Sequence, residues 1–586
     1  MASAQEKSQS LAVHMVETER FEDPGGWTVD QQCMDVIGSS YLIAHGCGQP
    51  VADAVTNIRL PSGGRYRVWV RTRDWVAQFG FPETFGHFRM LVNDQPLTPV
   101  FGADKRAQWH WQDGGFVELE DPDVSLRLQD LDGFDGRCDA VLFAREPDFL
   151  PPEEREALDA LRRECGGVQQ DPVDAGQFDF VVAGGGVAGI CAAVAAAREG
   201  LNVALLHDRP VLGGNNSSEI RVHIGGKRNL EPFPALGNIV NEIIPSEDHG
   251  NAQPQAYYED DKKLAAVEKE PNIYLALNTH VVDVESAGGR ITAVVAQDIE
   301  TGARTRYAAG LFADCTGDGA VGHLAGAEYR VGREGKAETG ERLAPEVPDT
   351  MVMGSSIMWY TEQAESETHF PEFPWATGFS EEVCDPAERG DWNWEVGMKQ
   401  DQITDIEWIR DYGLRTAYGN WSFVKNRSAW KDEFRNHRLA WVGCIAGKRE
   451  SRRLLGDVVL TEEDIEENRI FPDACVTTTW TIDLHYPREI PAFDGAPFRS
   501  YADHVQKPPY PIPFRCFYSR NIENLMMAGR NISVTHIALG TTRVMGTCGM
   551  MGEVVGMAAG LCCEQNVPPR AVYTDYLQKL FDRFCL

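Results

Sequence analysis

The chain has 586 residues, which is more than one hydrophobic core usually serves, so two or three domains are expected. Its 88 acidic and 55 basic residues leave a formal net charge of −33 at pH 7, and such a chain repels nucleic acids and anionic membrane surfaces. The 14 cysteines show neither a CxxC motif nor the Cys/His spacing of a zinc site, and the first residues lack a signal-peptide pattern. We therefore expect a cytoplasmic protein with reduced thiols, no metal centre, and neither nucleic acid nor membrane as partner.

The first part of the chain has the pattern of an all-β domain. Residues 1–16 are expected to form a tail, and residues 17–146 contain alternating strands separated by Gly-Gly and Asp-Gly turns. Tyr66, Val68 and Val70, for example, alternate with arginines, which is the period of a half-buried strand. The region from 17 to 146 is therefore predicted to be a β-sandwich.

A dinucleotide-binding motif follows a linker. Residues 147–177 contain a charged helix with prolines at its start, PPEEREALDALRREC, and then a polar linker. Next comes the apolar strand 178–183, which leads into Gly184, Gly186 and Gly189 in the spacing G-x-G-x-x-G, a helix of small residues and a second apolar strand. In such a unit the glycines allow a tight turn and a close approach of backbone N–H groups to a pyrophosphate at the helix N-terminus.

Further segments follow in a recognisable order, and together they carry a family resemblance. RPVLGG and SSEIRV follow the second strand, GKRESRRLLGD lies farther on, and AGRNIS and RVMGT lie near the C-terminus. Residues 178–586 thereby resemble the FAD-dependent oxidoreductases with a glutathione-reductase-like flavin fold. The resemblance implies FAD as cofactor and a multidomain fold, α/β plus all-β: a βαβ FAD-binding domain, an inserted α+β substrate domain and the N-terminal β-sandwich.

The resemblance also implies domain boundaries and cofactor contacts. The first part of the FAD-binding domain would span 178–330 with a cap insertion at about 221–270, the substrate or cap domain 331–514, and the second FAD-binding part 515–586. Three glycines would hold the pyrophosphate, a Thr-Gly-Asp segment would lie near the ribityl phosphate, and a Gly-Arg pair would begin the C-terminal flavin segment. In that order these residues are Gly184, Gly186 and Gly189, then Thr316, Gly317 and Asp318, and then Gly529 and Arg530.

The loop after the second strand departs from the family pattern at one position. Where many flavoproteins place a glutamate that accepts the adenosine ribose hydroxyls, this chain has His207 with Asp208 beside it, and either could serve. The Gly-Gly pair and polar residues that follow could line the flavin, and Arg221 could neutralise a phosphate of FAD. The further cofactor-binding candidates are Gly214, Asn216, Ser217 and Arg221.

A flavin that oxidises an alcohol carbon needs a base for the hydroxyl proton. His536, which follows the Gly529-Arg530 pair, is the first candidate, and His223 is the second. Either histidine could instead be structural. Arg543 could neutralise charge on the cofactor or form a surface ion pair. The basic run 448–453 would place like charges together if it were helical, so it calls for an anion or for acidic partners.

Two features of the sequence bear on the substrate: the absence of a second nucleotide-binding motif and the positions of the tryptophans. No second G-x-G-x-x-G unit is present, so the substrate itself is expected to reduce the flavin, and the electron acceptor stays open. Eight of the 14 tryptophans fall between Trp359 and Trp441, and aromatic rings stack on sugars, although core packing is the commoner role of any one of them. The sequence thus favours oxidation of a hydroxyl on a carbohydrate-like substrate. The alternatives are a fumarate-reductase-like flavoprotein acting on a CH–CH bond of a carboxylic acid, and a glycan-binding scaffold with structural FAD.

The N-terminal region also resembles golvesin-like or carbohydrate-binding β-sandwich modules through GGWTVDQQ, GRYRVWVRTRDW and DGRCDAVLF. Trp69, Trp75, Trp109 and Trp111 could then grip a glycan. The alternative is that the module docks on the flavin domain or forms a contact between subunits of a homo-oligomer.

Overall fold

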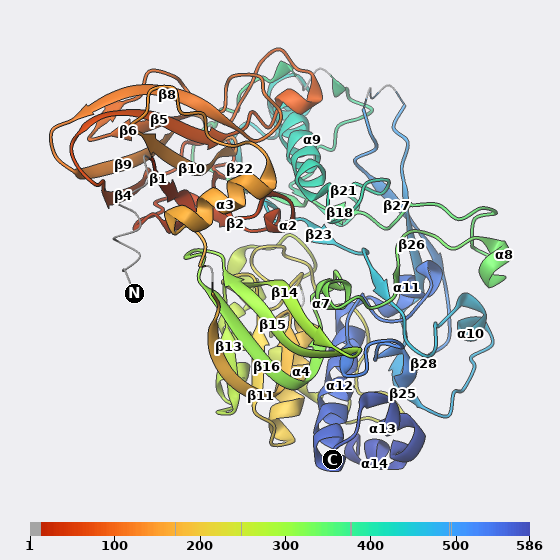
Figure 1. The fold of residues 1–586 in the computed structure, drawn as a ribbon. Coiled ribbons are helices and arrows are strands. Elements are labelled where there is room, and N and C mark those ends of the chain that lie inside the picture. The colour runs from red at the N-terminus through yellow and green to blue at the C-terminus, as the bar shows by residue number, and fades with distance from the viewer. Residues whose placement is uncertain are drawn as a thin grey trace.

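The computed structural model describes residues 13–169, 171–247, 249–374, 378–491, 493 and 495–585. The chain forms an N-terminal β module, a domain built on a mainly parallel sheet, and a middle region that is inserted in sequence between the two parts of the sheet domain. In Figure 1 the module, in red and orange, lies above the sheet domain and beside helix α9 of the middle region. Residues 1–12 of the expected tail and Trp375 of the tryptophan-rich stretch lie outside the described residues.

The N-terminal module consists of two antiparallel sheets that share one core. One sheet has the order β2-β3-β10-β5-β8 with β1 beside β10, and the other has the order β4-β9-β6-β7. Val68 and Val70 of the first sheet pack with Leu126 and Leu128 of the second, as the alternating pattern of these strands requires. The elements are β1 (Val13–Glu17), η1 (Thr18–Arg20), β2 (Thr28–Asp30), α2 (Met34–Ile37), β3 (Tyr41–Ala44), β4 (Ala54–Arg59), β5 (Gly64–Thr72), η2 (Ala77–Phe79), β6 (Phe88–Val92), β7 (Gln95–Pro96), β8 (His110–Leu119), β9 (Asp123–Asp130) and β10 (Gly136–Ala144).

Two boundaries of this module differ from the sequence expectation. Strand β1 starts at Val13, so residues 13–16 belong to the sheet and not to a tail. The helix of the expected linker, α3 (Arg155–Cys165), packs on the module through Leu158 and Leu161. Its buried Arg162 lies 2.6 Å from Asp139 and 3.2 Å from Glu17, and these two carboxylates fix the helix to the sheet.

The sheet domain has the strand order β13-β12-β11-β16-β15-β14, and β29 pairs with β16. Strands β11, β12, β13, β16 and β29 pair in parallel, whereas β14 and β15 are antiparallel. The predicted βαβ unit is β11, α4 and β12, although β11 begins at Val173 and not at 178. The elements are β11 (Val173–Ala183), α4 (Val187–Arg198), β12 (Val203–Leu206), α5 (Asn238–Ile243), η3 (Gln255–Tyr258), α6 (Asp260–Glu268), β13 (Ile273–Ala276), β14 (Thr279–Ala287), β15 (Arg290–Asp298), β16 (Arg304–Asp314), α7 (Ala320–Leu324), η5 (Phe514–Cys516), β29 (Leu525–Met527), α11 (His536–Thr542), α12 (Met545–Gln565), α13 (Pro569–Asp575) and α14 (Leu577–Arg583).

Helices α4 and α12 cross in close contact because small residues face each other. A Cβ atom at Gly552 would lie 2.1 Å from the carbonyl oxygen of Ala188, and one at Gly556 would lie 2.4 Å from that of Ala192. Helix α12 is long and apolar enough to span a membrane, but 89% of its most apolar window is buried inside the protein. Helices α5 and α6 also pack on α4, so this part of the expected cap insertion at 221–270 belongs to the domain core.

The middle region consists of the long helix α9 and small antiparallel sheets of two or three short strands. Trp359, Trp394 and Trp421 are buried in its core, and Trp408 and Trp430 pack against it, so five of the eight tryptophans in this stretch serve packing. Leu460 and Val476 pack instead in the core of the sheet domain, which divides the expected 331–514 unit. The elements are β17 (Tyr329–Arg330), α8 (Lys336–Thr339), β18 (Ser355–Ser356), β19 (Trp359–Gln363), β20 (Arg389–Gly390), β21 (Glu395–Val396), α9 (Ile406–Asn426), β22 (His437–Val442), β23 (Gly447–Lys448), β24 (Arg453–Leu454), α10 (Glu462–Glu466), β25 (Ala474–Thr478), β26 (Ile482–Pro487), β27 (Ser500–Val505) and β28 (Tyr510–Pro513).

The N-terminal module docks on α9 through buried charges. Arg137 of β10 lies 2.6 Å from Asp411, both side chains are fully buried, and Arg410 pairs with Asp30 of the module. The four tryptophans proposed to grip a glycan do not form an exposed platform. Trp69, Trp75 and Trp111 are buried, and Trp109 donates to Glu407 of α9. Of the two alternatives for these residues, the buried tryptophans and the contacts with α9 favour docking over a glycan grip.

Candidate functional site

A cavity of about 550 Å³ lies where β11, β12 and β16 end, at the carboxyl edge of the parallel sheet, which is where open α/β sheets bind their ligands. Residues from all three regions line it, including Asp35 of the N-terminal module, Gly186 of the sheet domain and Arg449 of the middle region. Most of the sequence-predicted residues meet on its wall. They are Gly184, Gly186, His207, Asp208, Gly214, His223, Thr316, Gly317, Asp318, Gly529, Arg530 and Arg543.

The glycine loop brings two backbone segments to the cavity without side chains between them. Gly186 is the N-cap of α4, and its Cα faces Gly214 on the neighbouring loop, where a Cβ on Gly214 would come within 3.1 Å of it. Gly184 has φ +102°, which favours glycine. Gly189 is not on the cavity wall formed by the described residues. A Cβ there would lie 1.7 Å from the carbonyl oxygen of Gly184, so its role is to let α4 pack on the loop.

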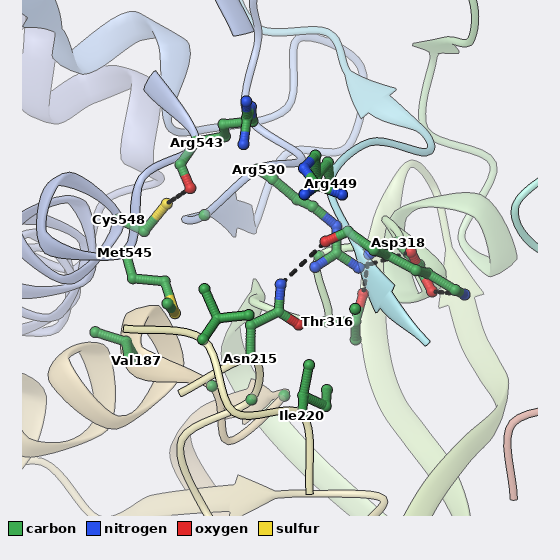
Figure 2. Close-up of a pocket in the computed structure, with 18 of the residues that line it drawn as sticks. Val187, Asn215, Ile220, Thr316, Asp318, Arg449, Arg530, Arg543, Met545 and Cys548 are labelled. Carbon is green, nitrogen blue, oxygen red and sulfur yellow. Dashed lines mark hydrogen bonds and ion pairs between the residues drawn. The ribbon is translucent and has the colours of Figure 1, made fainter. Parts of the chain in front are cut away.

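Asp318 is the centre of a charged group on the opposite wall, shown in Figure 2. Its carboxylate accepts from Lys448 at 2.7 Å, Ser451 at 2.7 Å and Arg530 at 2.9 Å. Burial would raise the pKa of Asp318, but Lys448 and Arg530 outweigh it and hold the pKa well below its usual range. The basic run 448–453 is not helical, and three of its cations pair with carboxylates of the protein. Of the two partners considered for this run, it therefore has acidic side chains.

Comparison with known families decides the identity of this fold. The sequence model of the family described as FAD dependent oxidoreductase matches residues 179–581, which is more than half of the chain. The chain belongs to the FAD-dependent oxidoreductase family. No curated protein sequence matches it.

Solved structures similar to this FAD-dependent oxidoreductase are distant. A geranylgeranyl bacteriochlorophyll reductase-like protein from Thermoplasma acidophilum is 13% identical over 70% of this chain and 82% of its own, with a TM-score of 0.28. The myxobacterial chondrochloren halogenase is 13% identical over 70% and 78%, with a TM-score of 0.32. The E. coli quinol fumarate reductase subunit is 12% identical over 70% and 75%, with a TM-score of 0.27. Similarity this low carries no argument about activity.

The cavity fits the cofactor of an FAD-dependent oxidoreductase. Its glycine walls leave room for a close backbone approach, and the N-terminus of α4, at Gly186 and Val187, opens onto it, as a pyrophosphate requires. Arg530 adds a cation, and its buried Nε has no hydrogen-bond partner among the described residues. FAD is therefore the cofactor that the family and the residues on the cavity wall support.

Three loop residues predicted to bind FAD hold the protein together instead. Asn216 donates to the carbonyl of Val222, and Ser217 donates to that of Gly214. Arg221, at φ 67°, donates to the Ser218 and Gln253 carbonyls, and its guanidinium lies 4.2 Å from the Trp441 ring centroid. None of the three lines the cavity as the described residues form it. Their hydrogen bonds to main-chain carbonyls shape the loop that presents Gly214.

His536, the first choice for the catalytic base, lies outside the cavity wall as described. It begins α11, its side chain is 3% exposed, and its Nδ1 lies 2.8 Å from a carboxylate oxygen of Glu450. Its backbone N–H donates to Glu334 at 2.9 Å. His536 thus joins α11 to neighbouring segments and is not among the residues that line this cavity.

Sequence reasoning missed the group that the middle region contributes to the cavity. His485 of β26 lines it, with Nδ1 at 2.6 Å from Glu395 and Nε2 at 3.3 Å from Asp483. Burial would raise the pKa of Glu395, but Arg449 and His485 outweigh it and lower the pKa to about 2. The available signal was the alternation of Asp483 and His485 within a strand, which places both on one face, but no motif marks it.

The other two predicted catalytic residues lie on the same wall. Arg543 donates to Asp483 at 3.1 Å, and His223 Nδ1 lies 2.8 Å from the side-chain oxygen of Asn251. Trp392 and Trp480 also line the cavity, and the Trp392 ring centroid lies 5.1 Å from that of His485. A proton acceptor, cations and aromatic surfaces thus meet in one space.

Proposed function

We propose that this protein oxidises a hydroxyl-bearing carbon of a carbohydrate-like substrate and that His485 takes the hydroxyl proton. The observation that carries the proposal is the position of His485 on the cavity wall, between Glu395 and Asp483. FAD, when bound, supplies the two-electron acceptor for a hydride from the substrate carbon. A second small molecule then has to take the electrons away.

The contacts of His485 suit a general base. Nδ1 of His485 contacts the Glu395 carboxylate at 2.6 Å. Nε2 is left to take the hydroxyl proton, because Asp483 Oδ1, 3.3 Å away, accepts no hydrogen bond among the described residues. The Asp483 carboxylate would then stabilise the imidazolium that forms. The low pKa of Glu395 keeps that carboxylate ionised at neutral pH, so it holds the ring in the tautomer with the proton on Nδ1. A carboxylate that orients a histidine in this way is a recurring arrangement in proton transfer.

Substrate placement falls to aromatic and polar side chains of the same wall. Trp392 and Trp480 offer ring surfaces to the apolar face of a sugar. The indole N–H of Trp480 lies 3.4 Å from Asp483, so the residue beside the base also orients this ring. His223 and Asn251 add polar groups that could meet sugar hydroxyls.

The experiment is an anaerobic absorbance screen of the flavin band with sugars, glycosides, polyols and organic acids. We expect one sugar or polyol class to bleach the flavin, and His485→Gln to slow bleaching at least about 100-fold with FAD content unchanged. His249→Gln, outside the cavity wall and paired with Glu247, serves as control and should bleach at the wild-type rate. Full bleaching rates in His485→Gln would refute its role as base.

The second candidate, reduction or oxidation of a CH–CH bond in a carboxylic acid, rests on two arginines. Arg449 and Arg543 both line the cavity, and the buried Nε of Arg543 has no hydrogen-bond partner among the described residues. Turnover of an unsaturated acid by the reduced protein, lost in Arg543→Met, together with no bleaching by any sugar, would establish this function. If neither assay shows a reaction, the remaining hypothesis is a glycan-binding scaffold in which FAD is structural.

A further inference from the structure

His280, at the start of β14, lies between two carboxylates from different parts of the chain. Its Nε2 is 3.0 Å from Asp35 of the N-terminal module, and its Nδ1 is 3.7 Å from Asp208 at the end of β12. All three side chains line the cavity. We call Asp208, His280 and Asp35 the nucleotide clasp.

His207, the other candidate for the ribose contact, has both ring nitrogens occupied. Its Nδ1 accepts from the backbone N–H of Gly185 at 3.1 Å, and its Nε2 lies 2.9 Å from the carbonyl of Val211. These two contacts satisfy a neutral imidazole completely. The ring therefore supports the glycine loop, and the ribose contact falls to Asp208.

Asp208 is available for a ligand because its side chain is 42% exposed on the cavity wall. Its segment is fixed to the start of β14 by backbone hydrogen bonds from Thr279 to His207 and from Asn278 to Arg209, at 2.7 and 3.3 Å. A carboxylate at this place in a dinucleotide fold accepts the hydroxyls of a ribose.

The N-terminal module is held where Asp35 can reach His280. Gln32, three residues earlier, donates to the carbonyl of Cys444 at 3.0 Å and accepts from the N–H of Ala446 at 2.9 Å. Burial would lower the pKa of His280, but Asp208 and Asp35 outweigh it and raise the pKa to about 10. At neutral pH the histidine is therefore a cation between two anions.

We propose that the N-terminal module closes the adenosine end of the FAD site, with Asp35 and His280 as positioning residues that hold Asp208 toward the ribose hydroxyls. Release of FAD then depends on a module that lies outside the nucleotide-binding domain in sequence. The proposal needs FAD as the cofactor and is independent of the substrate.

The test measures two ligands on full-length protein. The rate of FAD release from the holoprotein is followed by flavin fluorescence, and the apoprotein is titrated with FAD and with an FAD analogue carrying 2′,3′-dideoxyadenosine. Asp208→Asn is expected to weaken FAD binding about tenfold and to bind FAD and the analogue equally. Asp35→Asn is expected to increase the rate of FAD release. It is also expected to bring the dissociation constants of FAD and the analogue closer together than they are in the wild type.

The controls separate positioning from a general structural effect. Glu118→Gln changes an exposed acid of the same module that pairs with Arg65 and should match wild type with both ligands. His280→Gln removes the same link from the sheet domain, so it replaces Asp35→Asn if that variant fails to fold. Wild-type FAD release in both variants, or equal weakening of both ligands, would overturn the proposal.

Discussion

Three buried histidines of this protein have the same side chain and different roles, because their partners differ. His207 has both ring nitrogens bound to backbone groups, and His536 pairs with Glu450 away from the cavity. His485 alone of the three combines a carboxylate partner with a place among the substrate-facing residues of the wall. Position in a motif indicates which residues lie near a cofactor, but hydrogen-bond partners decide what each ring can do.

The state of His207 predicts a pH dependence of stability. Burial and the nearby Arg209 lower its pKa to about 4, against about 6.5 in the unfolded chain. Between these values the unfolded chain binds a proton that the folded protein does not, so stability falls as pH drops from 6.5 to 4. Relative to His207→Gln, wild type should lose on the order of 3 kcal/mol across this window.

Denaturant unfolding of both proteins at pH 7 and pH 4.5 measures this effect. The gap in free energy of unfolding between wild type and His207→Gln should shrink at the lower pH. A gap that does not change with pH would contradict the prediction, because it would mean that the His207 ring takes up its proton equally in the folded protein and in the unfolded chain.

Local residues could be predicted from sequence, and paired residues far apart could not. The glycines of the loop can be recognised in the sequence, because the residues that make the tight turn, start the helix and let the backbone approach a phosphate all lie within six positions. Glu395 and His485 meet across 90 residues, and His280 meets Asp35 across 245. No local pattern encodes such pairs, because the fold that joins them depends on the packing of whole elements.

At the scale of elements, the contact between α4 and α12 shows where backbone shape outweighs helix propensity. The sequence indicates two helices of small apolar residues, and the strand before α4 supports the βαβ unit. It does not indicate that Gly552 and Gly556 face the carbonyl oxygens of Ala188 and Ala192. Glycine weakens an isolated helix, so its presence in α12 is explained by this close crossing.

Gly552→Ala is therefore predicted to destabilise the protein. Alanine gains about 0.5–1 kcal/mol in helix propensity, but a Cβ placed 2.1 Å from the Ala188 oxygen overpacks the crossing at a cost of about 1–3 kcal/mol. The net loss in the free energy of unfolding should be about 1 kcal/mol, within a range of about 0–2.5 kcal/mol. Cys563→Ala, at an exposed position of the same helix, should change it by less than about 0.5 kcal/mol. Increased stability of Gly552→Ala would show that α12 can shift.

At the scale of the whole molecule, buried ion pairs join the N-terminal module to the middle region. Arg137 and Asp411 are fully buried partners, whereas Arg59 and Asp123 of the same module form a pair in which both side chains are about 70% exposed. The sequence predicted a β module and left its role open between glycan binding and docking. The charges that decide for docking lie some 270 residues apart, beyond what any segment shows alone.

These two pairs predict a sharp contrast between two variants. Arg137→Met leaves Asp411 buried with fewer partners and should cost about 3–5 kcal/mol. Arg59→Met removes an exposed pair and should cost less than about 1 kcal/mol. Denaturant unfolding followed by tryptophan fluorescence measures the free energy of unfolding of both variants. Equal losses would show that the buried pair between the module and α9 contributes no more than an exposed pair.

The residues that line the cavity lie far apart in the sequence, and this determines when the site can form during synthesis. Gln31 and Cys548 both line the cavity, and β29 and α12, close to the C-terminus, complete the sheet and the packing of α4. The cavity wall is therefore complete only after synthesis has passed Cys548, so FAD can be held only once residues from all three regions have been made.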